Sequence, residues 1–314
     1  MIHYYLTDNN KLSEISVPQA GCWISMVDPD DTEIKNIANQ YDLDIDILKA
    51  ALDTDERSRI DSDDKYTMIL VNIPTVEEKS YKELYSTIPM SIVLVKDVII
   101  TVCSENTPIL SIFTQGRVKG FHTTMKSRFI LQFLYHIATL YLQYLRYIDK
   151  KSEEVEVLLH KSTQNRELIE LLKLEKSLVY FTTALRSNEV VLEKLLRTEL
   201  IKKYPDDSEL LEDVIVENKQ AIEMANIYSG ILSGMMDAFA SVISNNLNIV
   251  MKVLAIITIV MAIPTMIFSA YGMNVNTAGM PFAQSAFGFP IIIALTIALS
   301  VIVTLIFVKF RMFK

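Results

Sequence analysis

Apolar residues dominate the C-terminal part of the chain, where they form two long uncharged stretches. From Val253 to Val308 the sequence contains no Asp, Glu, Lys, Arg or His. Each stretch is long enough for a helix to cross a bilayer, at ~1.5 Å of rise per residue. The pattern therefore predicts a transmembrane hairpin. Its parts are a first span at 253–270, an external loop at 271–286, a second span at 287–308 and a basic tail at 309–314.

Upstream of this hairpin, apolar residues recur at three- to four-residue steps and helix-breaking residues are rare. Between Phe121 and Val253 the only proline is Pro205, and the only glycines are Gly230 and Gly234. This pattern predicts very long helices with a break at Pro205. The expected helices run from about Thr124 to His160, from about Arg166 to Lys202, and from about Ser208 without interruption to Ala270.

The first 120 or so residues instead mix short β-rich runs with helical signals, which predicts an α/β domain. Strands are expected at His3–Leu6, Cys22–Met26, Tyr66–Ile73, Ser91–Val95 and Val98–Cys103, and helices at Asp31–Tyr41 and Ile45–Leu52. The predicted organisation is a cytoplasmic α/β domain at 1–120, long cytoplasmic helices including a stalk helix at 121–252, and the hairpin at 253–314.

Charge divides the chain in the same way. The formal net charge is −8, and because residues 253–314 contribute +3, residues 1–252 carry −11. An acidic soluble region repels nucleic acid and attracts cations. The basic residues flanking the spans are Lys252, Lys309, Arg311 and Lys314, whereas the loop has no charge. The positive-inside rule then places both termini in the cytoplasm of a multi-pass protein of the cell membrane. The N-terminus lacks the pattern of a signal peptide, which agrees with this orientation.

The polar residues indicate neither an enzyme nor a tightly bound cofactor. Cys22 and Cys103 lie in expected strands and are interpreted as buried core thiols. Asp42, Asp44 and Asp46 alternate like an EF-hand loop, but the sixth position is not glycine and the twelfth is not glutamate, so a solvated helix face is the better interpretation. The chain has no phosphate-binding glycine loop, catalytic triad spacing or zinc-ligand spacing.

A stripe of small, hydroxyl and apolar residues follows one face of the first span. It comprises Asn248, Met251, Leu254 or Ala255, Thr258, Ala262, Thr265, Ser269 and Gly272. Two spans cannot enclose a polar path, so conduction along this stripe would require several copies around an axis. Such a lining would suit Mg²⁺, which keeps its water. On periodicity alone, helix packing is the commoner explanation of such a stripe.

The residues Tyr271, Gly272, Met273 and Asn274, at the end of the first of two C-terminal spans, resemble the signature of the CorA family of magnesium and cobalt transport channels. The preceding stretch, SGILSGMMDAFASVISNNLNIVMKVLAIITIV at 229–260, is similar to the family's stalk and inner helix. Residues 22–34 and 52–61 resemble its cytoplasmic domain more loosely.

This resemblance implies a homopentamer with a funnel of α/β/α cytoplasmic domains and a pore lined by the first span. Asn274 would meet a hydrated ion, Gly272 would let the backbone turn, and Met273 and Tyr271 would brace that turn by packing. The family's pore-lining positions fall on Asn248, Met251, Leu254, Ala262 and Thr265, with Met251 and Leu254 as the hydrophobic constriction. Mg²⁺ would be both the transported ion and a regulatory ligand, held between subunits by Asp213 and another carboxylate.

The external loop departs from the family pattern because residues 275–290 include no acidic residue, which leaves ion preference open. The expected function is uptake of Mg²⁺, and of Co²⁺ in addition, down the membrane potential. One alternative is a Zn²⁺, Co²⁺ or Ni²⁺ transporter of the same fold. The other is a membrane-tethered helical scaffold or sensor, for which the stripe would be a packing surface.

Overall fold

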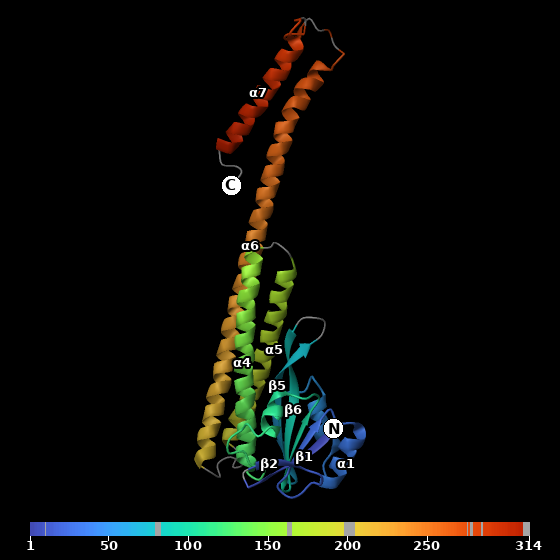
Figure 1. The fold of residues 1–314 in the computed structure, drawn as a ribbon, viewed down its shortest axis with the longest axis vertical. Coiled ribbons are helices and arrows are strands. Elements are labelled where there is room, and N and C mark those ends of the chain that lie inside the picture. The colour runs from blue at the N-terminus through green and yellow to red at the C-terminus, as the bar shows by residue number, and fades with distance from the viewer. Residues whose placement is uncertain are drawn as a thin grey trace. The chain divides into compact units, whose positions relative to one another are not determined.

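A seven-stranded mixed sheet lies at the centre of the N-terminal part of the chain (Figure 1). The computed structural model describes residues 1–9, 11–78, 83–161, 165–197, 205–274, 276, 279–283 and 285–309. The strands are β1 (Ile2–Asp8), β2 (Lys11–Ile15), β3 (Trp23–Val27), β4 (Arg59–Ser62), β5 (Tyr66–Glu78), β6 (Glu83–Val95) and β7 (Val98–Cys103). Their order in the sheet is β2-β1-β3-β7-β6-β5-β4. Only the β3–β7 pair is parallel among these neighbours.

The helices are α1 (Asp31–Tyr41), α2 (Ile45–Lys49), α3 (Pro108–Thr114), α4 (Lys126–Lys161), α5 (Asn165–Arg197), α6 (Pro205–Tyr271) and α7 (Gly288–Lys309), with a 3₁₀ turn at Ala50–Leu52. The expected strands and helices are therefore present, while residues 198–202 of the second expected long helix lie outside the described residues. The structure adds β2, β4 and α3, which the apolar pattern did not predict. Pro205 does not lie in a break but opens α6, because its missing N–H has no partner in a first helical turn.

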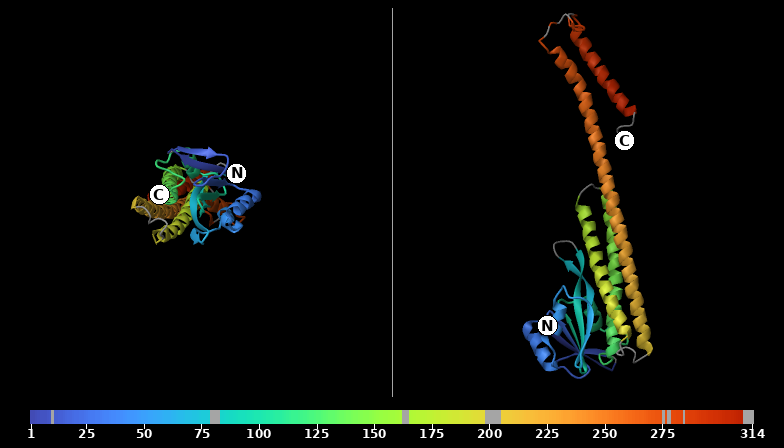
Figure 2. Two further views of the ribbon diagram at one scale, coloured as in Figure 1. Left: turned by 90° about the horizontal axis from the view of Figure 1, so that it is seen from below. Right: turned by 180° about the vertical axis from the view of Figure 1, so that it is seen from behind.

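Helices cover both faces of the sheet, which gives the predicted α/β/α sandwich (Figure 2). On one face, α1, α2 and the 3₁₀ turn bury a core with residues such as Ile34, Leu48 and Ile100. On the other face, α4 and α5 pack over β5 and β6. There Trp23 lies against Phe129 and Phe133, with ring centroids 5.5 Å away in both cases, and donates a 2.8 Å hydrogen bond to the Thr101 hydroxyl.

The side-chain amide of Asn188, on α5, pairs with the backbone of β5 in the way that a neighbouring strand would. Its Oδ1 accepts from the Asn72 N–H at 2.9 Å, and its Nδ2 donates to the Asn72 carbonyl at 2.7 Å. The hydroxyls of Ser58 and Tyr141 complete the buried network, at 2.8 Å from Asn188 Oδ1 and 3.0 Å from the Asn72 carbonyl. The network fixes α5 on the sheet because unpaired buried amides are costly.

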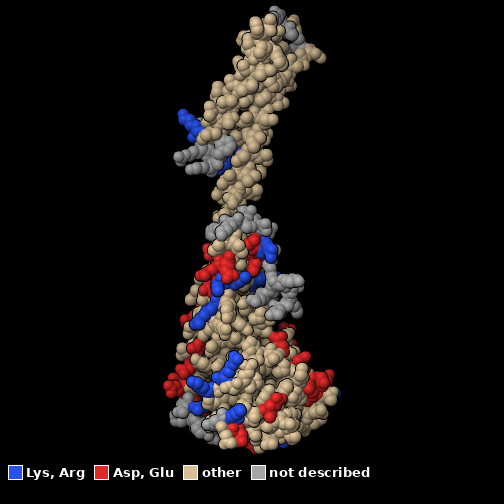
Figure 3. Space-filling view, in the orientation of Figure 1, with Lys and Arg blue, Asp and Glu red and all other residues tan. Residues whose placement is uncertain are grey.

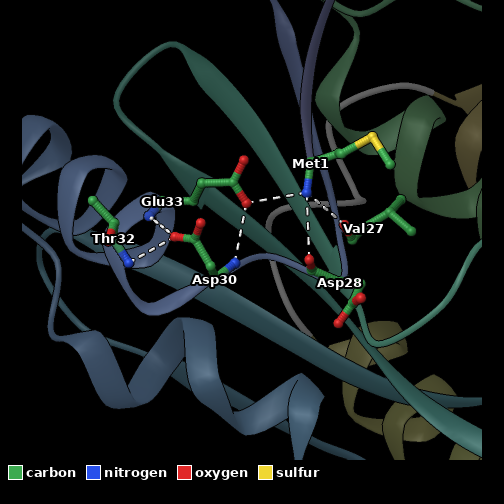
Figure 4. Close-up of polar contacts among 6 residues, drawn as sticks. All are labelled: Met1, Val27, Asp28, Asp30, Thr32 and Glu33. Atoms are coloured by element: carbon green, nitrogen blue, oxygen red, sulfur yellow. Dashed lines mark hydrogen bonds and ion pairs between the residues drawn. The ribbon is translucent and has the colours of Figure 1, made fainter.

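The N-terminus is attached to the start of α1 (Figure 4). Asp30 is the N-cap and forms a capping box with Glu33. The Met1 ammonium donates to the Val27 carbonyl at 2.9 Å and pairs with Glu33 Oε2 at 3.0 Å. Glu33 therefore stabilises the helix start and the N-terminal strand together.

The first third of α6 packs onto α4 and α5. The buried Asp207 carboxylate accepts from the Ser127 hydroxyl and lies 3.3 Å from Arg128 Nε. Further along α6, Asn218 Nδ2 donates to the Leu185 carbonyl at 3.2 Å. Desolvation and then the adjacent Asp149 carboxylate raise the pKa of Tyr228. These polar contacts hold residues 207–228 of α6 against the sandwich.

The chain divides into two compact units, Met1–Met236 and Asp237–Lys314. The first contains the sandwich, α4, α5 and the beginning of α6. The second contains the end of α6 together with α7. The unbroken helix α6 belongs to both units. The domain boundary predicted from the sequence, at 252/253, is the start of the first apolar span, whereas the two compact units meet at 236/237.

Candidate functional site in the apolar hairpin

Two helices of the described chain are long and apolar enough to cross a membrane, namely the one that ends at Tyr271 and Gly288–Lys309. Their apolar side chains are largely exposed, with Met261 65% and Leu305 61% accessible. In the space-filling view the described residues between Lys252 and Lys309 show no red or blue side chain (Figure 3). Side chains of this kind are stable in contact with lipid or with other apolar helices.

The membrane segment of α6 has one covered face. The residues of this face are buried or half-buried and follow the helical repeat; they are Val253, Ile256, Val260, Ile267 and Tyr271. Ile256 is 4% exposed, and Thr296 of α7 is 1% exposed. Because α7 is the other helix described in this unit, we assign this face to α6–α7 packing.

The predicted stripe lies on the opposite face of α6. Ala262 of the stripe is half-buried. The exposed residues of the stripe are Asn248, Met251, Leu254, Thr258, Thr265 and Ser269. Met251 and Leu254 are 57% and 56% exposed. At about 3.6 residues per turn, the stripe lies about half a turn from the covered face. The stripe is therefore not the surface on which this chain's own hairpin packs.

The two threonines of the stripe have a defined hydrogen-bonding role. The Thr258 hydroxyl donates to the Leu254 carbonyl at 2.8 Å, and the Thr265 hydroxyl donates to the Met261 carbonyl at 2.9 Å. Each hydroxyl hydrogen is thus used within the helix, which leaves the oxygen lone pairs as acceptors. An acceptor surface is complementary to the water of a hydrated cation, whose hydrogens point outward.

The Tyr-Gly-Met-Asn motif lies at the C-terminal end of α6. The Gly272 N–H donates to the carbonyls of Phe268 and Ser269, at 2.9 and 3.2 Å, and so closes the helix. Gly272 does not adopt the left-handed backbone conformation, and a Cβ there would be in ordinary contact, 3.4 Å from the Phe268 carbonyl oxygen. Met273 is 58% exposed and Asn274 is also exposed, so neither is packed within the chain.

Tyr271 braces the motif by a hydrogen bond in addition to packing. Its hydroxyl donates to the Pro281 carbonyl at 2.8 Å, across the loop that joins the two helices. Sequence reasoning did not find this contact. A backbone carbonyl carries no signal in the residue pattern. The Ala, Gly and Thr residues between Tyr271 and Pro281 form no recognisable turn motif.

Asp213 belongs to the other compact unit, Met1–Met236. It is exposed on α6, beside the buried Leu211 and Val214 that face the sandwich. In the part of the chain that the structure describes, no three His, Cys, Asp or Glu side chains come together as a metal site. Asp213 therefore belongs to no such group among the described residues of one chain.

Asp42 and Asp44, from the rejected EF-hand pattern, have structural roles. Asp42 pairs with Lys65, whose hydrogen bond and positive charge lower the pKa of the Asp42 carboxyl. Asp44 is the N-cap of α2 and accepts from the Asp46 N–H at 3.2 Å. Lys309 ends α7, whereas the rest of the basic tail, at 310–314, lies outside the described residues.

Known proteins resemble the chain over almost its whole length. A cobalt/magnesium transport protein CorA of Methanocaldococcus jannaschii is 30% identical over 307 residues, which cover 95% of this chain and 93% of that protein. A cobalt/magnesium transport protein CorA of Thermotoga maritima is 28% identical over 279 residues, 84% of this chain and 75% of that protein. The complete structure of the CorA magnesium transporter from M. jannaschii matches with a TM-score of 0.82 and 24% identity, covering 98% of this chain and 97% of that one.

The model of one protein family matches residues 18–309, a range that includes the sandwich from β3 onward, the long helices, the Tyr-Gly-Met-Asn motif and both apolar helices. These comparisons agree with the resemblance in the motif and stalk residues. The chain belongs to the family of CorA-like Mg²⁺ transporter proteins.

Proposed function

We propose that this chain carries Mg²⁺, and Co²⁺ in addition, into the cell as a homopentameric channel. The observation that supports it best is the exposed stripe on α6, which lies opposite the face assigned to α7 and leads to the Tyr-Gly-Met-Asn motif. Several copies arranged with these stripes around one axis would enclose a path that a single hairpin cannot form. The bilayer surrounds the outer faces of the hairpins, and both termini lie in the cytoplasm.

At the outer mouth, a ring of Asn274 amide oxygens accepts hydrogen bonds from the water held by the ion. Mg²⁺ sheds that water reluctantly, so recognition of the hydrated ion avoids a large dehydration cost. The acceptor oxygens of Thr258 and Thr265 continue this polar surface along the pore. Met251 and Leu254 form an apolar constriction near the cytoplasmic end, which closes the path by excluding water.

The membrane potential supplies the driving force. A divalent ion moving inward across 100 mV gains about 4.6 kcal/mol, since each charge gains about 2.3. The acidic region 1–252, with a formal charge of −11, attracts the cation that has crossed. Transport is therefore passive and requires neither a catalytic site nor a bound cofactor.

The test is Mg²⁺ uptake by purified protein in liposomes that contain a Mg²⁺-sensitive dye and carry an inside-negative potential. We expect uptake that depends on the protein and rises with the potential. Absence of flux at every internal Mg²⁺ concentration would reject the proposal. Adding Zn²⁺, Ni²⁺ or Co²⁺ as competitors in the same assay ranks the alternative transported ions.

Asp213 is proposed to hold a regulatory Mg²⁺ between neighbouring subunits. Facing carboxylates repel unless a cation lies between them, so loss of internal Mg²⁺ loosens the closed assembly. Asp213→Ala should raise the internal Mg²⁺ concentration needed for half-inhibition by about tenfold, which corresponds to loss of ~1.4 kcal/mol. The measurement is flux at stepped internal Mg²⁺. Glu212→Ala, the neighbouring exposed acid, is the control, and equal inhibition in wild type and Asp213→Ala would remove Asp213 from gating.

A further inference from the structure

A basic segment interrupts the acidic region of the chain. Residues 106–148 contain no Asp or Glu, although residues 1–252 carry a formal charge of −11. Three of its basic side chains, Arg117, Lys119 and His122, belong to residues 115–125, which form the loop between α3 and α4. A local excess of positive charge attracts anions that the rest of an acidic surface repels.

The α3–α4 loop lines a cleft of about 500 Å³. Lys11 and Leu12, at the start of β2, line the same cleft. From the loop, Val118 adds an apolar side chain, whereas Gln115 and His122 add polar ones. A volume in this range accommodates a small molecule, and a lining that mixes apolar and polar groups orients it.

The α3–α4 loop is held in place by the sheet and by α4. The Thr7 N–H, on β1, donates to the Thr123 hydroxyl at 3.2 Å, and the Thr123 N–H donates to the Thr7 hydroxyl at 3.1 Å. Gln132 Nε2, on α4, donates to the Lys119 carbonyl at 3.1 Å. Phe121, in the middle of the loop, is only 7% exposed. A wall fixed in this way binds a ligand with little cost of ordering.

The donors that line the cleft are not used elsewhere in the described part of the chain. Lys11 forms no ion pair with a described residue, and Asp8, which faces it in the β1–β2 register, is too far away to form one. The half-buried His122 ring has no hydrogen-bond partner among the described residues. Gly116 and Gly120 add bare backbone in the left-handed region, with φ of 67° and 65°. Backbone N–H groups beside such residues form concave surfaces that bind anions.

We propose that this cleft binds a phosphorylated small molecule of nucleotide size. Its phosphate oxygens accept hydrogen bonds from the Lys11 ammonium and the His122 ring, and such bonds are strong because the donor or the acceptor is charged. Its apolar part lies against Leu12 and Val118. The cleft belongs to the Met1–Met236 unit, so its occupation does not require the hairpin to conduct ions.

The test is equilibrium binding of radiolabelled ATP to the full-length protein in detergent and Mg²⁺-free buffer. We expect saturable binding, for which inorganic phosphate and adenosine compete at least tenfold more weakly than unlabelled ATP. Lys11→Gln should raise the dissociation constant about tenfold, as for loss of one charge-assisted hydrogen bond. Lys119→Gln is the matched control. Its side chain is exposed and lies outside the lining of the cleft, so the dissociation constant should change less than about threefold.

Val118→Trp separates a cleft from a merely basic surface, because it fills the cleft and leaves every charge in place. We expect it to abolish ATP binding. Binding that persists in Val118→Trp, or that weakens equally in Lys11→Gln and Lys119→Gln, would show diffuse attraction to the basic segment and overturn the site. The site is also overturned if wild-type protein binds no ATP, or binds inorganic phosphate as tightly as ATP. Because Lys11 is exposed, Lys11→Gln should fold normally and decides the question even if Val118→Trp does not fold.

Discussion

Asn274→Ala is expected to abolish selective Mg²⁺ uptake in liposomes while leaving the assembly intact. The exposed Asn274 side chain lies three positions beyond the end of α6, and its amide oxygen has no substitute in alanine. Loss of one hydrogen bond to an ion-bound group costs roughly 1.5–3 kcal/mol, which is about ten- to a hundredfold in rate. In a ring the loss is repeated in every subunit. The measurement is the initial rate of uptake at subsaturating external Mg²⁺.

Asn245→Ala is the control for this substitution. Asn245 is an exposed amide on the same helix but lies off the stripe, toward the covered face. The control should transport at the wild-type rate and show that deletion of an exposed amide on α6 is tolerated. A channel that keeps wild-type uptake after Asn274→Ala would leave the signature without a role in ion recognition.

Leu254→Ser should produce a channel that leaks when internal Mg²⁺ is high. Leu254 is 56% exposed in the single chain and lies on the stripe, so a ring of these side chains would form an apolar constriction. A hydroxyl at that level allows water to remain in the closed pore, and lowering the barrier by ~1.4 kcal/mol raises residual flux about tenfold. The measurement is Mg²⁺ flux with inhibitory Mg²⁺ on the cytoplasmic side.

Leu305→Ser, on α7, is the control for Leu254→Ser. It distinguishes leakage through a hydrated pore from leakage caused by general damage to a membrane helix. Leu305 is 61% exposed and belongs to the helix that the account places toward lipid. Its replacement should leave the closed state tight. Equal leakage from both variants would argue against a constriction at Leu254 and for loosened packing of the hairpin.

Most of the architecture could be predicted because its elements are long and strongly periodic. The helical pattern predicted Asp31–Tyr41, and these are the bounds of α1. The elements that the sequence did not predict lack that signal. β4 reads Arg-Ile-Asp-Ser and β2 reads Lys-Leu-Ser-Glu-Ile, so charged edge strands hide the alternation that marks a strand. Neighbouring strands, not local residue preference, make them part of the sheet.

The stripe was predictable from helical spacing, but its meaning was not. Periodicity places Thr258 and Thr265 on one face and cannot say whether α7 covers that face. The burial of Ile256 on the opposite side of α6 indicates that, in the single chain, α7 covers that side and not the stripe. The link between Tyr271 and the Pro281 carbonyl could not be predicted, because the acceptor belongs to the backbone and its position depends on the path of the loop.

Thiol accessibility within the hairpin tests most directly whether the stripe lines a water-filled path. The native Cys22 and Cys103 are buried, and desolvation raises the pKa of Cys103 to about 11, so both thiols should react slowly at neutral pH. Cysteine can therefore be placed at Thr265 on the stripe or at Leu295 on α7, each a few residues from the outer loop and each exposed in the single chain.

A membrane-impermeant thiol reagent added outside should modify Thr265→Cys and block Mg²⁺ uptake. The same reagent should leave Leu295→Cys unmodified in lipid and its uptake intact. Modification of Leu295→Cys with an inaccessible Thr265→Cys would contradict the account, because the water-filled path would then run along the wrong helix.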